Sequence, residues 1–414
     1  MKWPLVKNLK ERRKENQLMK RVLYLLSLCG SILLLSGCWD RLEINDLAIV
    51  TAVAIDRIDD KTIELSTQVI IPKNLSSGNG QAGVGQQSSL TIVRSQKGKN
   101  IADAISKLQT KLPRKIFWGQ CEVYIFSEEL AKKGVKEQMD FLLRHPQPRE
   151  RAYLFVSKID PKKILELSTP IERYSAETIM GLSDFRFSMQ VNLQSFEAML
   201  TSQANAAAIP LLEIQSAPKN EDSDQSNSLP AIIGTAVFKK DKMIGQISER
   251  ETRGVLLLRN EQKEFTVTLK SVDMKGNVSL YPVLLRTKLV PEIQGDKWKM
   301  LVKVKANGAI VQNGTDLDYS NELLKKKLEK VFQEKIKDGI EQSLKEVQQN
   351  LKTDIIGFAD EFHRTYPKQW KKVENHWDEK FPTVEVKIDV DANIRRQGYI
   401  NKPGAIPEKE VRNK

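Results

Sequence analysis

Hydrophobic and polar residues form several short strand-like patterns in the first half of the chain. Residues 48–56 and 62–71 are apolar, β-branched runs separated by Asp59 and Asp60, a pattern typical of two strands joined by a turn. Residues 121–126 (CEVYIF) predict a buried central strand. A further strand is expected at 153–156, and helical periodicity is found at 98–112, 128–144, 161–167, 171–182 and 193–202.

The second half is richer in consecutive strand candidates. Residues 232–238 and 241–246 predict a hairpin, and 383–390 alternates apolar and polar residues cleanly, as a half-buried strand does. The remaining strand candidates, expected to be mostly antiparallel to one another, are 265–269, 278–288 and 298–306.

The most periodic element extends from residue 321 to about 362. Asn321 is a plausible N-cap, and a continuous helix over this range would be about 60 Å long. Gly339 and Gly357 are expected to be weak points or ends, because glycine is a poor helix former. We expect the helix to pack lengthwise on the antiparallel sheet; a coiled coil with a partner is the alternative, although the spacing departs from strict heptads. The apolar stripe consists of Leu324, Leu328, Val331, Ile336, Ile340, Leu344, Val347, Leu351 and Ile355.

These patterns favour an α+β fold with several mixed α/β lobes, mainly antiparallel sheets, and a long C-terminal helix packed on the last sheet. Residues 217–229 are polar and lack periodicity, which predicts a linker. The expected organisation is a signal peptide at 1–37, an N-terminal region at 38–216 (an α+β lobe to about 160, then a helical or mixed lobe from 161), a C-terminal α+β domain at 230–401, and a loose tail at 402–414.

The N-terminus has the pattern of a secretory signal. Lys20 and Arg21 precede an apolar run at 22–35, which is too short to span a bilayer core that needs about 20 residues. Leu35, Ser36 and Gly37 then lead to Cys38, and this sequence looks like a bacterial lipobox. Cleavage before Cys38 and acylation of its thiol would leave a lipid-anchored protein, while an ordinary signal peptide or an uncleaved anchor is the alternative. Because a compact signal begins at Met19, translation is predicted to start there.

Charge and cysteine content refine this picture. Residues 1–37 carry eight of the 66 basic and two of the 53 acidic residues, so the formal charge falls from +13 to +7 in the mature chain. This mild excess suits a protein beside anionic lipid and gives little support for nucleic acid binding, because no basic run is interleaved with aromatic residues. With Cys29 in the signal and Cys38 acylated, only Cys121 of the three cysteines remains, which excludes an intramolecular disulfide.

No residue constellation typical of an enzyme is found. The chain has no Gly-x-Ser-x-Gly elbow, no His-Glu-x-x-His and no P-loop, and we expect no catalytic residue, cofactor or metal. His363, His376 and Asp378 could meet, but a third firm ligand is missing. His145 is expected at a helix end and Cys121 as an inert core thiol. The tryptophans 118, 298, 370 and 377 are scattered in sequence and are expected in the core or at an interface.

Several stretches, in order, resemble the C-subunit lipoproteins of spore germinant receptors, the GerAC-type family. They cover nearly the whole mature chain, although each is only moderately specific alone; the extension at 1–18 departs from the pattern and bears only on the start site. The stretches are SGCWDRLEI at 36–44, GQCEVYIF at 119–126, LA-x-x-G at 130–134, GTAVFK-x-DKMIG at 234–245, DIIGF at 354–358 and P-x-x-W at 367–370.

The resemblance implies three mixed α/β lobes, no catalytic activity, and a subunit of a nutrient-sensing receptor in the spore inner membrane. Its implied partners are an A-type subunit and a B-type integral membrane subunit. Lipidation of Cys38 carries over residue for residue, whereas no residue here is implied to bind the germinant. An extracytoplasmic solute-binding lipoprotein of a transporter is the alternative from another class, and an envelope enzyme comes third.

Overall fold

The computed structural model describes residues 14, 18–27, 43–71, 90–168, 171–184, 188–215, 228–262, 264–396, 403–404 and 406–412. The chain divides into two compact units, Met1–Leu47 and Ala48–Lys414. In the first unit, residues 18–27 are helical and η2 (Ile44–Asp46) is a single 3-10 turn. Among the residues described, no helix combines the length and the apolar character needed to cross a membrane.

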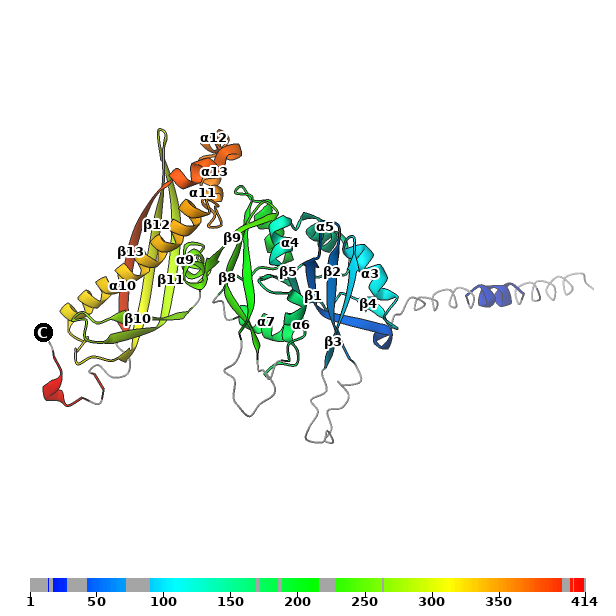
Figure 1. The fold of residues 1–414 in the computed structure, drawn as a ribbon, viewed down its shortest axis with the longest axis horizontal. Helices are drawn as coiled ribbons and strands as arrows, with labels where there is room; N and C mark the ends of the chain where they lie inside the picture. Colours follow the sequence, from blue (N-terminus) through cyan, green and yellow to red (C-terminus); the bar gives the residue numbers. More distant parts are fainter. Residues whose placement is uncertain are drawn as a thin grey trace, which may run out of the picture. The chain divides into compact units, whose positions relative to one another are not determined.

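A nine-stranded mixed sheet dominates the first half of the second unit (Figure 1). The strand order is β3-β2-β1-β5-β6-β7-β8-β9, with β4 beside β1. β1, β5, β6 and β7 are parallel neighbours, whereas the pairs toward both ends are antiparallel. The strands are β1 (Leu47–Arg57), β2 (Ile63–Ile70), β3 (Thr91–Gly98), β4 (Lys115–Phe117), β5 (Val123–Ser127), β6 (Tyr153–Ser157), β7 (Ala206–Gln215), β8 (Leu229–Lys239) and β9 (Lys242–Ser248).

Helices cover both faces of this sheet because its central strands are apolar on both sides. In β1, Val53 and Ile55 belong to one core cluster and Ala52 and Ala54 to the other. On the first face lie α3 (Ile101–Gln109), α4 (Glu128–Lys133), α5 (Lys136–Arg144) and α8 (Leu193–Leu200). On the second lie α6 (Pro161–Leu165) and α7 (Ser175–Asp184).

The predicted hairpin at 232–246 is confirmed as β8 and β9, but it lies elsewhere than expected. It was expected within the C-terminal domain, whereas β8 pairs with β7 and extends the first sheet. Residues 217–227 of the predicted linker lie outside the described residues, and Leu229 is already the first residue of β8. β7 and β8, which lie on either side of this polar segment in the sequence, pair with each other. The polarity of the segment between them does not reveal that pairing.

The second sheet has the order β10-β11-β12-β13. β10 (Phe265–Lys270), β11 (Asn277–Gln294) and β12 (Lys297–Asn313) are antiparallel neighbours, as predicted. β13 (Glu385–Arg396) instead runs parallel to β12, from Lys299 opposite Glu385 onward. α9 (Glu249–Leu258) follows the first sheet directly, and its buried Val255 and Leu256 belong to the same core cluster as both sheets.

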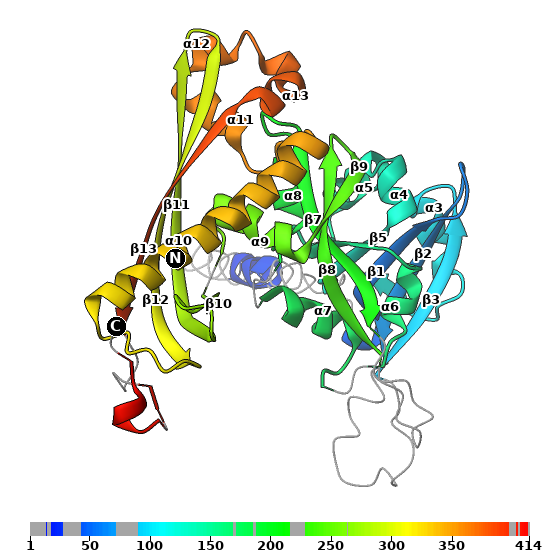
Figure 2. The ribbon, with the colours of Figure 1, turned by 60° about the vertical axis from the view of Figure 1, so that its left-hand side comes forward.

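The long C-terminal helix is shorter than predicted. α10 (Glu322–Leu344) lies along the second sheet (Figures 1 and 2) and buries Leu324, Leu328, Phe332, Ile336 and Ile340. Asn321 caps it as expected, since its side chain accepts from the backbone N–H of Leu323 and Leu324. After the π-helical η3 (Lys345–Asn350) the chain leaves the helix, and the φ of Lys352 is +50°. Gly339 is therefore not an end.

The rest of the predicted helix near 362 is a separate group of short helices. It comprises α11 (Phe358–Thr365), α12 (Pro367–Trp370), η4 (Glu374–His376), α13 (Trp377–Lys380) and η5 (Phe381–Thr383). Gly357, with φ of +100°, is the N-cap residue of α11.

The predicted helix at 128–144 is two helices, α4 and α5. Gly134 ends α4 with a φ of +127°, which is accessible mainly to glycine. The next backbone N–H, that of Val135, donates to the carbonyl of Asp241 in the β8–β9 turn, 2.9 Å away. A hydrogen bond to a distant segment thus replaces the helical one, which the local periodicity could not indicate.

Candidate functional site

The predicted lipid-attachment residues lie outside the described residues. These are Leu35, Ser36, Gly37 and Cys38. Of residues 39–44, which follow the predicted attachment site, only Glu43 and Ile44 are described, and Ile44 begins η2. Cys38 lipidation therefore stays a prediction.

Cys121 is a buried thiol two residues before the start of β5, rather than inside the strand as predicted. Its Sγ lies 3.5 Å from the carbonyl oxygen of Val123, to which it donates. Burial raises the pKa of the Cys121 thiol to about 12. Because the thiolate is the nucleophilic form, this neutral thiol fits a structural role.

His145, His363 and Asp378 contact different residues, and His376 is the last residue of η4. His145 ends α5, as expected, and its ring stacks on Phe141. His363 lies on α11 beside Trp370, whereas Asp378 forms an ion pair with Lys239, with Nζ and Oδ2 2.6 Å apart. No group of three or more metal-binding side chains occurs among the described residues.

Three of the four singled-out tryptophans gather in one aromatic cluster. The ring centroid of Trp377, in α13, lies 5.0 Å from that of Trp370 in α12 and 6.1 Å from that of Trp298 in β12. Phe362 completes the cluster at 4.6 Å from Trp298. Trp118 lies apart, against Tyr124. The positions are buried as expected, but their gathering was not predicted because it depends on the return of the chain after α10.

Asp354 holds the start of α11 against this aromatic cluster. Its carboxylate accepts from the backbone N–H groups of residues 356–359 and from Nε1 of Trp377, at distances between 2.7 and 3.2 Å. Burial raises the pKa of Asp354, and the hydrogen bonds from these donors oppose the rise. Sequence reasoning missed this role, although the Asp-x-x-Gly pattern before a helix could have indicated a capping carboxylate.

Next to Asp354, a crevice of about 510 Å³ separates the first sheet from the second. Met199 comes from α8, Thr287 from β11 and Arg364 from α11. Arg259 crosses the crevice: its Nη1 donates to the carbonyl of Ile355 at 2.9 Å, and its Nε donates to Glu261 at 2.8 Å. Arg259 thus connects the end of α9 to the segment that precedes α11. The crevice lining also contains the ion pair of Arg364 with Glu361.

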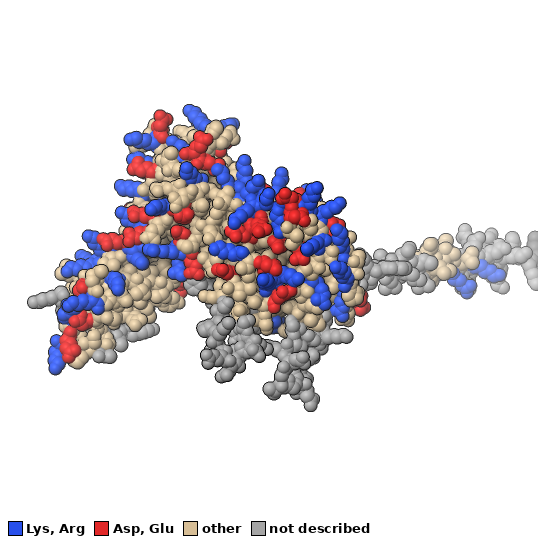
Figure 3. Space-filling view, viewed as in Figure 1, with Lys and Arg blue, Asp and Glu red and all other residues tan. Residues whose placement is uncertain are grey.

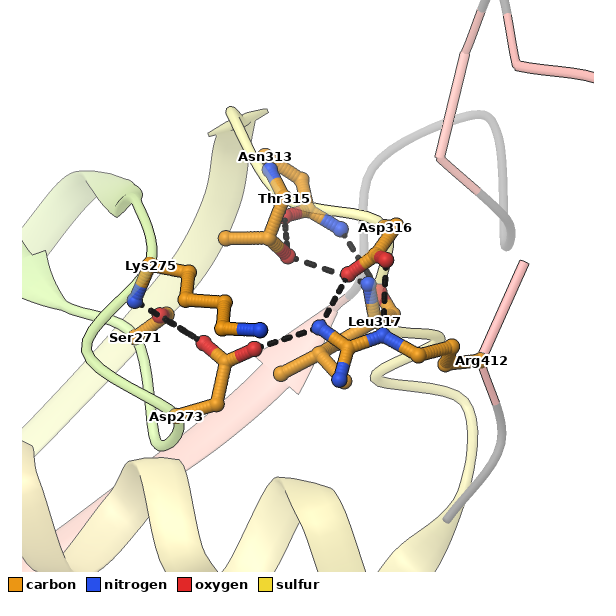
Figure 4. Close-up of polar contacts among 8 residues, drawn as sticks. All are labelled: Ser271, Asp273, Lys275, Asn313, Thr315, Asp316, Leu317 and Arg412. Atoms are coloured by element: carbon orange, nitrogen blue, oxygen red, sulfur yellow. Dashed lines mark hydrogen bonds and ion pairs between the residues drawn. The ribbon is translucent and has the colours of Figure 1, made fainter. Parts of the chain in front are cut away.

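A loose tail was predicted for 402–414. Within its described part, Arg412 contacts the segments that follow β10 and β12. The Arg412 guanidinium lies between two carboxylates (Figure 4). It donates to Asp316 at 2.6 Å and forms an ion pair with Asp273. The backbone N–H of Arg412 also donates to the Asp316 carbonyl. The Ser271 hydroxyl and Arg412 together lower the pKa of Asp273 to about 2.

Charged side chains are interspersed on the face shown in Figure 3, where blue and red residues alternate over the regions of both sheets. The described ion pairs are mostly exposed and separated by three or four residues along a helix, such as Lys107 with Asp103. Such pairs contribute little to stability. This face therefore carries a mixture of both charges.

Two family models match the chain in sequence order. A model described as "Spore germination protein N-terminal domain" matches residues 40–214. A model described as "Spore germination B3/ GerAC like, C-terminal" matches residues 233–398.

Curated relatives match over almost their full length. "Spore germination protein KC" of Bacillus subtilis is 28% identical over 388 residues, which cover 90% of this chain and 95% of the relative. "Spore germination protein B3" of the same species is 24% identical (90% and 96%), and "Spore germination protein GerQC" of Bacillus cereus is 22% identical (92% and 99%). The crystal structure of the GerBC protein has the same fold, with a TM-score of 0.52 and 19% identity, covering 83% of this chain and 96% of that one.

Proposed function

Because the chain belongs to the GerAC-like family of spore germination proteins, we propose that it is the lipid-anchored C subunit of a receptor that senses nutrients and starts spore germination. The observation that carries this proposal is the ordered match of the two family models over residues 40–214 and 233–398. A chance match to one short motif would not extend over both halves in the right order.

The anchor in this proposal is a diacylglycerol on the thiol of Cys38. The short apolar run at 22–35 and the small residues Ser36 and Gly37 before the cysteine support it. The match to the N-terminal family model begins at residue 40, two positions after Cys38. Each buried lipid CH₂ contributes about 0.8 kcal/mol, so two acyl chains hold a protein stably on a membrane. The folded body then lies on the extracytoplasmic face of the spore inner membrane.

We infer further that the body acts by binding and not by catalysis. Two buried ionisable groups of the described residues fit structural roles: Cys121 is a neutral core thiol, and Asp354 accepts from the first backbone N–H groups of α11. In the receptor, the partners are an A-type and a B-type membrane subunit, and the C subunit contributes assembly or signalling.

Membrane attachment through Cys38 is tested by comparing two cysteine variants. Cys38→Ala is expected to leave the membrane fraction of spores and to weaken germination, because the acyl acceptor is lost. Cys121→Ser is the matched control and should stay on the membrane, because this thiol is buried and carries no lipid. The wild-type N-terminal peptide should also carry the mass of its acyl chains. An unmodified Cys38 together with membrane binding of Cys38→Ala at the wild-type level would contradict the anchor.

The receptor role is tested by crosslinking and pulldown from spore membranes. Recovery of A-type and B-type subunits supports the proposal, whereas recovery of an ABC permease would favour a solute-binding lipoprotein. The mass of the precursor separately tests whether translation starts at Met19: a precursor that contains residues 1–18 would contradict that start.

A further inference from the structure

A groove of about 360 Å³ lies along the free edge of the second sheet. Four consecutive residues of β10, from Phe265 to Thr268, form one wall. Helices α9 and α10 supply the other lining residues, apart from Gln262, which lies between α9 and β10. β10 is the end strand in the order β10-β11-β12-β13 among the described residues. The far side of an edge strand presents backbone N–H and C=O groups that can pair with another strand.

The groove is apolar at its base and basic at its rim. Leu257, Val267 and Ile336 line the base and are buried. Arg250, Arg253 and Lys335 lie at the rim against a single acidic residue, Asp338. Neither Arg250 nor Lys335 has an ion pair within the described part of the chain, and Arg253 has only an exposed 3.8 Å pair with Glu249. The rim therefore favours carboxylates.

Packing requires glycine at one of the two glycine positions that line the groove, Gly254, but not at the other, Gly339. A Cβ on Gly254 would lie 2.7 Å from the Gly339 carbonyl oxygen and would collide with Ser343, so the crossing of α9 and α10 requires this glycine. A Cβ on Gly339 would touch nothing within 4 Å. Glycine weakens a helix interior, yet packing does not require it here. A side chain at Gly339 would enter the groove, and a residue that breaks a local rule without a packing reason indicates a functional position.

We propose that this groove binds an extended segment of a protein partner, which adds to β10 as a further strand. In such an interaction, main-chain hydrogen bonds provide affinity and alternating side chains provide specificity. The segment carries an apolar side chain for the base, formed by Leu257, Val267 and Ile336, and carboxylates for the rim. A flat bilayer cannot enter a groove, which favours a protein segment. In the spore the partner is another receptor subunit, and to that extent the inference rests on the proposed function.

The test places a benzophenone amino acid at Thr268, an exposed residue of the groove wall, in the full chain in sporulating cells. Illumination should join it to a stretch of a partner protein with an apolar residue flanked by acidic ones. Gly339→Leu in the same chain should lower the yield at least about tenfold, which corresponds to about 1.4 kcal/mol of binding energy. Gly181→Leu is the matched control, because Gly181 is also a helix glycine with open space at its Cβ position, and it lies in α7.

A second variant keeps the inference testable if Gly339→Leu unfolds. Arg250→Glu with Lys335→Glu reverses two rim charges without touching the apolar base and should lower the yield similarly. An unchanged crosslinking yield in both variants would contradict the proposal that the groove binds a protein segment. Capture of a lipid or a small molecule by the benzophenone at position 268 would also contradict it. If the benzophenone at position 268 captures no protein while A-type and B-type subunits still copurify, binding in the groove would be refuted and the receptor role would stand. Capture of an acidic segment from an unrelated protein would refute the receptor role alone.

Discussion

Individual residues show which features the sequence could reveal. The burial of Cys121 and the position of His145 at a helix end followed from local pattern, and both predictions are confirmed. The role of Asp354 was missed because its hydrogen-bond donors depend on where α11 begins and on Trp377, which comes from a later helix. The Arg412 contacts were missed because nothing in a polar tail indicates which distant carboxylates it will meet.

Arg412→Ala should make stability less dependent on pH in the acidic range. Hydrogen bonds from Ser271 and from Arg412 hold the folded-state pKa of Asp273 at about 2, below its ordinary value of 3.8, and Arg412 also lowers the pKa of Asp316. The contacts of Arg412 with these carboxylates therefore stabilise the fold above about pH 4 and lose their effect as the pH falls toward 2. Because the pair is exposed, we expect Tm at pH 6 to fall by at most about 2 °C.

The measurement is the difference in Tm between wild type and Arg412→Ala at pH 6 and near pH 3. Lys409→Ala, another exposed change in the tail, is the control and should not alter Tm. The difference should shrink on acidification; a difference that stays constant or grows would show that the contact with Asp273 is not the cause.

The sequence predicted which helices and strands exist better than it predicted where they begin and end. The strands at 265–269 and 298–306 exist, but β12 continues to Asn313. The helix at 321–362 breaks after Asn350, because the buried Gln348 donates to the carbonyls of Phe381 and Val384 and fixes the end of the helix against a later segment. Periodicity shows which face of a helix is buried, but not where tertiary contacts will end it.

The crossing of α9 and α10 gives a prediction for two helix glycines. Gly254→Ala should lower the free energy of unfolding by about 1–3 kcal/mol, because its Cβ would force the helices apart. Gly339→Ala should raise it by up to about 1 kcal/mol, because alanine is the better helix former and meets open space. Urea titrations followed by tryptophan fluorescence measure both. Equal effects of the two substitutions would show that the crossing is looser than described.

For the whole molecule, the α+β class and the family resemblance were correct, while the assignment of strands to sheets was not predictable. β8 and β9 join the first sheet and β13 pairs in parallel with β12. Such pairings connect residues that are far apart in sequence, so local alternation identifies each strand without identifying its neighbours.

The two sheets of the second unit should unfold in one transition. Polar contacts connect their surroundings: Nε1 of Trp370 donates to Gln203 at 3.0 Å, and Arg259 donates to the Ile355 carbonyl at 2.9 Å. Far-UV circular dichroism and tryptophan fluorescence should therefore give the same Tm. Two separate midpoints would mean that the halves behave as independent domains.

The parallel pairing of β13 with β12 also affects how the protein is made. Residues 314–384 must be synthesised before Glu385 can reach Lys299, and pairing between distant residues slows folding. During this interval the β12 edge of the nascent chain is open to strands of other molecules. Lys297, Lys299, Lys303 and Lys305 lie on one face of β12, with Leu301 between them, and charged side chains on an open strand hinder aggregation. We therefore expect these lysines to disfavour pairing with strands of other molecules until β13 has been synthesised.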